Sequence, residues 1–126
     1  MKYFIDSSAW IEYFNGSSIG EKVSEIVSSE DEIFILSINI GEVISFLKRD
    51  NKNFHIAYES MIKRAKIFDI TPRIAKDSGI MHAEKRISGS SFSLADALII
   101  NSAKSIQAHV LTKDSHFKDF KEAIII

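Results

Sequence analysis

The strongest structural signal in the chain is the segment SLADALIINSAK (residues 93–104), which is followed by HVLTKD (residues 109–114). Apolar side chains at helical spacing predict that the first segment is a helix and that it is almost fully buried. The second segment predicts a strand over His109–Thr112. Asp96 falls in the first turn of the helix, and Asp114 comes just after the strand. A carboxylate near the start of a largely apolar helix needs an explanation, and other acids spread along the chain suggest one.

The composition is that of a globular protein. The 126 residues are 45% hydrophobic with one proline and five glycines, and we expect a single domain over residues 1–126. The formal net charge of −1 indicates that any nucleic-acid site is a local patch. The absence of cysteine excludes disulfides, thiolate metal sites and cysteine nucleophiles. Asp6 interrupts the N-terminal apolar run too early for a signal peptide, and no apolar run approaches the length of about 18 residues that a membrane span needs. We therefore expect a cytoplasmic protein without a membrane partner.

Strands alternate with helices along the rest of the chain. Short apolar runs predict further strands at Tyr3–Ile5, Ile33–Leu36, Ile67–Ile70 and Ala123–Ile126. Helical spacing of apolar residues predicts helices at Ser7–Phe14, Ile19–Ser29, Ser37–Arg49, Phe54–Ala65 and Pro72–Ile87, and a short helical turn around Phe117 and Phe120. This alternation predicts βαβ units, and therefore an α/β fold: a three-layer α/β/α sandwich with a mostly parallel central sheet.

Four acids occupy the same kind of position in this architecture, where a strand has ended or a helix has just begun. They are Asp6, Glu42, Asp96 and Asp114. In open parallel α/β sheets, ligands bind at the edge outside the carboxyl ends of the strands. The sequence therefore predicts that the four carboxylates converge at this edge.

Helix capping is an alternative explanation for each acid taken singly. The caps would be Asp6, Asp114 and the capping-box pairs Asn39/Glu42 and Ser93/Asp96. Such caps are common and stabilise a helix by about 1 kcal/mol. Four acids at one edge are harder to explain in this way, because like charges raise one another's pKa and destabilise the fold unless a cation neutralises them.

Oxygen ligands without cysteine or paired histidines favour Mg²⁺ or Mn²⁺ over Zn²⁺. Mg²⁺ held by a few carboxylates most often acts on phosphates, where it activates water and stabilises in-line displacement at phosphorus. Ser7 and Thr112 lie next to the acids in sequence, and their hydroxyls can orient a carboxylate or a bound water. Equally, Thr112 is a typical β-branched strand residue, and Ser7 is a typical residue at a helix start.

Four short motifs carry a family resemblance: FIDSS (residues 4–8), GEV (41–43), LADALII (94–100) and VLTKD (110–114). In this order and spacing they resemble the PIN domain family and, within it, the VapC-type toxins of bacterial and archaeal toxin–antitoxin pairs. The resemblance implies an α/β/α sandwich and a magnesium-dependent endoribonuclease, with Asp6, Glu42, Asp96 and Asp114 as its acidic site. It also implies a homodimer and a protein antitoxin as partner. The run NSA (101–103) stands where the family usually has a run of small residues.

Basic residues near the predicted acidic edge are candidates for contacting the RNA. Arg86 and Lys113 can attract RNA phosphates, although solvated surface charge is the commoner role of Lys and Arg. His116, two residues after Asp114, is a candidate general base, but a bound metal can activate water without one.

Two other functions fit parts of the pattern. A non-catalytic PIN-like module would bind RNA or a protein without cleaving it, but such modules have usually lost an acid, and all four are present here. A phospho-receiver-like signalling domain is another small parallel α/β fold with an acidic site. It requires paired acids after the first strand and an acceptor Asp after the third, whereas Asp6 is followed by Ser7 and the predicted third strand by Thr71-Pro72.

Overall fold

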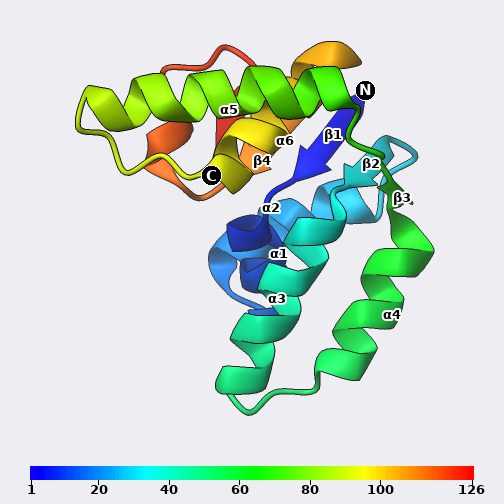
Figure 1. The fold of residues 1–126 in the computed structure, drawn as a ribbon. Coiled ribbons are helices and arrows are strands. Elements are labelled where there is room, and N and C mark those ends of the chain that lie inside the picture. Colours follow the sequence, from blue (N-terminus) through cyan, green and yellow to red (C-terminus); the bar gives the residue numbers. More distant parts are fainter.

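A central sheet of five parallel strands runs through the computed structural model, which describes all of residues 1–126 (Figure 1). The strands are β1 (Lys2–Ile5), β2 (Glu32–Ile35), β3 (Lys66–Ile67), β4 (His109–Thr112) and β5 (Ala123–Ile125). Their order across the sheet is β3-β2-β1-β4-β5, which makes β1 the central strand. From β1 the sheet continues through β2 and β3 on one side and through β4 and β5 on the other. The strand order therefore reverses between β1 and β4, and their carboxyl ends form a topological switch point, where α/β proteins bind ligands.

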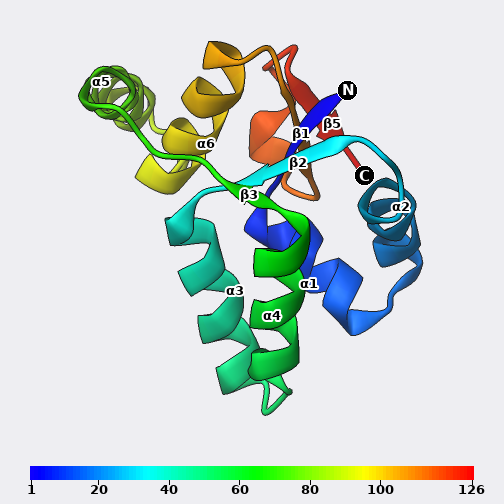
Figure 2. The ribbon, with the colours of Figure 1, turned by 90° about the vertical axis from the view of Figure 1, so that its right-hand side faces the viewer.

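Helices cover both faces of the sheet, so the predicted three-layer α/β/α sandwich is confirmed (Figure 2). They are α1 (Ser7–Asn15), α2 (Ser18–Val27), α3 (Ser37–Arg49), α4 (Phe54–Arg64), α5 (Pro72–Ile87) and α6 (Leu94–Ser105), with the 3₁₀ turn η1 (Ser115–Phe117) before β5. The first four helices lie on one side of the sheet, and α5 and α6 lie on the other. None of the helices has both the length and the apolar composition of a membrane span.

Side chains on the two faces of β1 and β4 pack into two separate hydrophobic cores. Because successive side chains of a strand point to opposite faces, Ile5 and Leu111 pack with α1 to α4, whereas Phe4 and Val110 pack with α6. Trp10 fills the first core, where it is fully buried and its ring stacks on Phe14 at 5.7 Å. Both strands are therefore covered on both sides, which explains the adjacent apolar residues in each of them.

Two close contacts join the helices of the first core. A Cβ atom on Gly20 of α2 would overlap the carbonyl oxygen of Glu12 in α1, so only glycine allows this approach. Arg64 at the end of α4 donates to three carbonyl oxygens at the end of α2 and in the turn that follows, those of Val27 (2.6 Å), Ser29 (3.0 Å) and Asp31 (2.8 Å). The guanidinium thus supplies partners for carbonyls that a helix end leaves open.

Two predicted ends differ from the structure by more than one residue, whereas the other predicted ends agree with it to within one residue. The sequence predicts the third strand over Ile67–Ile70, but β3 contains only Lys66–Ile67, and after the hydrogen bond from Phe68 N to Ile35 O (2.9 Å) the chain leaves the sheet. Of its apolar side chains, Phe68 packs edge-on against Phe4 and is partly buried in the second core, whereas Ile67 is exposed. The second helix ends at Val27 instead of Ser29, because the Ser29 hydroxyl turns back to the Ile26 carbonyl (2.7 Å).

Candidate active site

Asp6 is the most buried of the four acids, at 7% exposure, and both of its oxygens accept hydrogen bonds. It follows β1 and caps α1, because its Oδ1 accepts from the backbone N of Ser7 (2.8 Å). Its Oδ2 accepts from the hydroxyls of Ser8 (2.9 Å) and Thr112 (2.8 Å). Asp6 is therefore held rigidly between the start of α1 and the end of β4.

Thr112 and Ser8 connect the carboxyl ends of β1 and β4. Thr112 is fully buried, and its hydroxyl donates to Asp6 while it accepts from the backbone N of Asp114 (3.0 Å). The Ser8 hydroxyl likewise donates to Asp6 and accepts from the backbone N of Lys113 (3.1 Å). Each hydroxyl thus uses its donor for the carboxylate and its acceptor for the loop that carries Asp114.

Glu42 is reached by two side chains from different helices. Its Oε1 accepts from the hydroxyl of Ser7 (2.6 Å) and from Nδ2 of Asn39 (2.9 Å). The expected capping box of Asn39 and Glu42 is wrong, because α3 begins at Ser37 after Leu36, which makes no side-chain cap. Glu42 consequently lies beyond the first helical turn, and Asn39 points toward Ser7 and Glu42.

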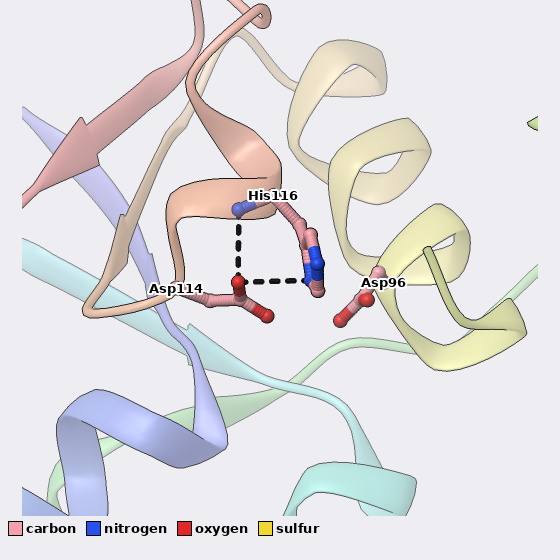
Figure 3. Close-up of side chains that lie close together, drawn as sticks. All are labelled: Asp96, Asp114 and His116. Carbon is pink, nitrogen blue, oxygen red and sulfur yellow. Dashed lines mark hydrogen bonds and ion pairs between the residues drawn. The ribbon is translucent and has the colours of Figure 1, made fainter. Parts of the chain in front are cut away.

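Asp96, Asp114 and His116 come together across the gap between α6 and the segment after β4 (Figure 3). One ligand atom of each residue lies within 4.8 Å of one ligand atom of the other two. Asp114 Oδ1 accepts from the backbone N of His116 (2.8 Å) and lies 3.1 Å from Nδ1 of the same residue. The other ring nitrogen of His116 is 3.0 Å from the hydroxyl of Ser91, so the imidazole links two loops beside the acids.

Asp96 both caps the start of α6 and lies close to another acid, Asp114. The predicted capping box is present: Ser93 Oγ accepts from the Asp96 backbone N (3.0 Å), and Asp96 Oδ2 accepts from the Ser93 backbone N (2.9 Å). Only one oxygen of Asp96 serves the cap. The other is available to a ligand, so the two explanations for this acid are not exclusive.

At three of the acids, the two oxygens of the carboxylate differ in their hydrogen bonding. One oxygen of each carboxylate makes all of its hydrogen bonds within the protein, and the other has no protein partner. The oxygens without a partner are Glu42 Oε2, Asp96 Oδ1 and Asp114 Oδ2. Asp6 differs because both of its oxygens are engaged.

Burial and the negative charges of neighbouring acids raise the pKa of Asp6 and Asp96. Burial raises the pKa of Asp6 to about 6, although hydrogen bonds from Thr112 and Ser8 work in the opposite direction, and the charge of Asp96 adds to the rise. Burial also raises the pKa of Asp96; its hydrogen bonds with Ser93 oppose this rise, while the charges of Asp114 and Glu42 reinforce it. The charges of neighbouring acids thus reach both Asp6 and Asp96 and disfavour the ionised form of each.

The basic candidates lie outside this cluster. The ammonium group of Lys113 is 3.4 Å from a carboxylate oxygen of Glu12, and the two residues line a hollow of about 340 Å³ that also borders Asp114. Arg86 is exposed, and its Nε donates to a ring nitrogen of His82 (3.3 Å) without any ion pair to an acid. Lys113 thus adjoins the site, whereas Arg86 makes no contact with it.

Asn39 and Ser8 are the contacts that sequence reasoning did not assign. Ser8 could have been found, because a hydroxyl two residues after an acid at a helix start commonly bonds to it. Asn39 had a signal, its spacing from Glu42, but that spacing also fits a capping box.

The chain matches one family model and is similar to several solved structures. The family model described as PIN domain matches residues 3–123. No curated protein sequence matches the chain. Among solved structures, VapBC2 from Rickettsia felis, bound to a DNA fragment from its promoter, is similar with a TM-score of 0.75 at 19% identity, covering 100% of this chain and 98% of that one.

Two further solved structures are similar to this chain. VapC20 from Mycobacterium tuberculosis, described as a Sarcin-Ricin loop cleaving toxin, has a TM-score of 0.74 at 15% identity and covers 94% of this chain and 95% of that one. PAE2754 from Pyrobaculum aerophilum has a TM-score of 0.74 at 17% identity and covers 99% of this chain and 89% of that one. At such identities the likeness establishes a shared fold.

Proposed function

Because the chain belongs to the PIN domain family, we propose that it is a nuclease, and more specifically a divalent-metal-dependent endoribonuclease that acts as the toxin of a toxin–antitoxin pair. One observation carries the proposal: at the carboxyl edge of the sheet, three acids each keep one oxygen without a protein partner, next to a fourth acid that is buried. The likeness to VapBC complexes and to a toxin that cleaves the Sarcin-Ricin loop supports the finer assignment.

The donor set fits a divalent cation. Carboxylate oxygens are the ligands that Mg²⁺ and Mn²⁺ prefer, and the proposed ligands are Asp6, Glu42, Asp96 and Asp114. A cation also removes the mutual repulsion that disfavours ionisation of Asp6 and Asp96. When bound, it would neutralise phosphate charge and activate the attacking water. His116 is a weaker candidate ligand, because each ring nitrogen has one binding position and both already have protein partners, whereas Asp6 Oδ1 accepts a single hydrogen bond and keeps a second lone pair.

The surrounding residues hold this site in shape. Thr112 and Ser7, with Ser8, fix the orientation of Asp6 and Glu42 before any ligand arrives. Such preorganisation means that binding need not order the carboxylates. Lys113, on the rim beside Asp114, and the exposed Arg86 are the proposed contacts to RNA phosphates.

The proposed partners are RNA, a protein antitoxin and a second copy of the chain. Large apolar side chains are exposed on α4 and α5 and offer surface for protein partners: Ile56, Tyr58, Ile62, Ile80 and Ile87. The similar structures named as VapBC support an antitoxin partner. Light scattering of the isolated protein should give about twice the chain mass of 14.2 kDa, and a monomer at high concentration would contradict the homodimer.

RNA cleavage tests the function directly. Purified protein, freed of any antitoxin, should cut RNA in Mg²⁺ or Mn²⁺, lose that activity in EDTA and regain it when the cation is restored. Asp114→Asn, which keeps the shape but removes a charge, should abolish cleavage. Full cleavage in EDTA would refute the metal mechanism.

The alternative functions predict different results. A non-catalytic module would bind RNA without cutting it in any cation. A phospho-receiver is disfavoured by the strand order β3-β2-β1-β4-β5, because receivers have the order 2-1-3-4-5, with the third strand at the centre.

A further inference from the structure

Asn39 is a buried polar residue, 1% exposed, that contributes to the site and poorly to the fold. Its Nδ2 donates to Ser7 Oγ (3.0 Å) and to Glu42 Oε1 (2.9 Å). Its Oδ1 is buried without a hydrogen-bond partner, which destabilises a folded protein. Asparagine is also a weak helix former, yet it lies in the first turn of α3. Fold stability therefore does not explain this residue.

The hydrogen bonds fix the directions of three side chains. Because Ser7 Oγ accepts a hydrogen from Asn39, its own hydrogen is free to point at Glu42 Oε1, 2.6 Å away. The opposite orientation of the Asn39 amide would place its Oδ1 against the carboxylate, so the network itself selects the orientation. Both donors therefore bind the same oxygen of Glu42, and Oε2 is left without a protein partner.

We infer that Asn39 is a positioning residue of the proposed nuclease, acting through Ser7 and Glu42 to present Glu42 Oε2 to the divalent cation. Glu42 is an exposed side chain on a helix surface, with no ion pair to hold it. Two donors on one oxygen restrict its rotamers before the cation binds, which lowers the entropy that binding must remove. The inference rests on the proposed function, because it concerns the same site.

The test is Asn39→Leu, which keeps the branched shape and the number of side-chain heavy atoms and removes both donors together with the unpaired acceptor. Mn²⁺ affinity, measured by electron paramagnetic resonance of the free ion, should weaken about 10- to 100-fold, as is typical when a partner that orients a ligand is removed. The melting temperature in EDTA should not fall, because a buried acceptor without a donor disappears. Ser102→Ala is the matched control, since the Ser102 hydroxyl is also buried without a partner, and its removal should leave Mn²⁺ affinity unchanged.

A double-mutant cycle separates positioning from general damage. If Asn39 acts through Glu42, then Asn39→Leu should have no further effect on Mn²⁺ affinity in the Glu42→Gln background. The inference is overturned if Asn39→Leu binds Mn²⁺ as the parent does, or if its effect is equal in both backgrounds. Asn39→Ala replaces the leucine variant if the latter does not fold. A parent protein that neither binds Mn²⁺ nor cuts RNA would refute the proposed function, and this inference with it.

Discussion

Replacing Asp6 by Asn should change how the stability of the metal-free protein depends on pH. Burial raises the pKa of Asp6 from 3.8 to about 6, so between these values the folded state binds more protons than the unfolded state. The contribution of Asp6 to stability is therefore fully present below about pH 4, falls as the pH rises toward 6 and stays low above it. A shift of one pKa unit corresponds to about 1.36 kcal/mol, so the total change is about 3 kcal/mol.

The amide of the Asp6→Asn variant does not titrate and has nearly the same shape, so the variant should lack this pH dependence. The amide oxygen can still accept from the Ser7 backbone N, and the amide nitrogen can donate to the hydroxyls of Ser8 and Thr112, because both have acceptor capacity left. The stability of the variant relative to the parent should thus rise by about 2 to 3 kcal/mol between pH 4 and pH 7.5.

Urea unfolding in EDTA measures this difference, with fluorescence of the single, buried Trp10 as the probe. The exposed Asp77→Asn variant controls for the loss of one negative charge. A stability difference between Asp6→Asn and the parent that is the same at pH 4 and pH 7.5 would refute the argument that burial of Asp6 opposes its ionisation.

Three further predictions concern the site and the packing around it. Asp96→Asn retains an oxygen that accepts from the Ser93 backbone N, so in EDTA the melting temperature of the variant should equal or exceed that of the parent. The variant should lose most of the stabilisation that Mg²⁺ gives the parent, and an equal gain from Mg²⁺ would argue against Asp96 as a ligand. Gly20→Ala should destabilise the protein by about 1 to 3 kcal/mol in urea unfolding because its Cβ overlaps a backbone carbonyl, whereas Gly79→Ala, a helical glycine with open space around it, should stabilise it by about 0.5 to 1 kcal/mol. Arg64→Met should lower stability by about 2 kcal/mol or more in the same assay, because it removes three hydrogen bonds made by a charged donor; a neutral result would mean that water replaces them.

The sequence predicted the layers and the neighbourhood of the acids because both depend on strong local signals. Adjacent apolar residues, Phe4-Ile5 in β1 and Val110-Leu111 in β4, indicate strands that are covered on both faces, and the acid that follows each strand lies at its carboxyl end. The capping box of Ser93 and Asp96 was predicted for the same reason, since only four consecutive residues decide it. The short β3 was misjudged because Phe68 and Ile70 are partly buried by the second core although the chain leaves the sheet after Phe68, and periodicity detects only burial.

The hydrogen bonds of the candidate site depend on tertiary structure and could not be predicted. Thr112 reaches Asp6 from 106 positions away, and Ser7 reaches Glu42 from 35. The segment from Asn39 to Glu42 fits both a capping box and a continuing helix, and in the structure the helix already begins after the buried Leu36. At Glu42, the choice of the oxygen without a protein partner likewise depends on another helix, because Ser7 of α1 donates to Oε1.

The strand order has a consequence for the chain during its synthesis. β1 needs β4 on one side, but roughly 100 residues separate Ile5 from His109, and at about 5 to 20 residues per second a ribosome takes about 5 to 20 s to make them. Throughout that interval the growing chain has an unpaired, apolar strand edge at Tyr3–Ile5, which invites aggregation or chaperone binding. The same delay postpones assembly of the acidic site, because Thr112 and Asp114 arrive with β4. A chain whose translation stops before β4 would therefore lack both the central pairing of its sheet and two of the residues that build the site.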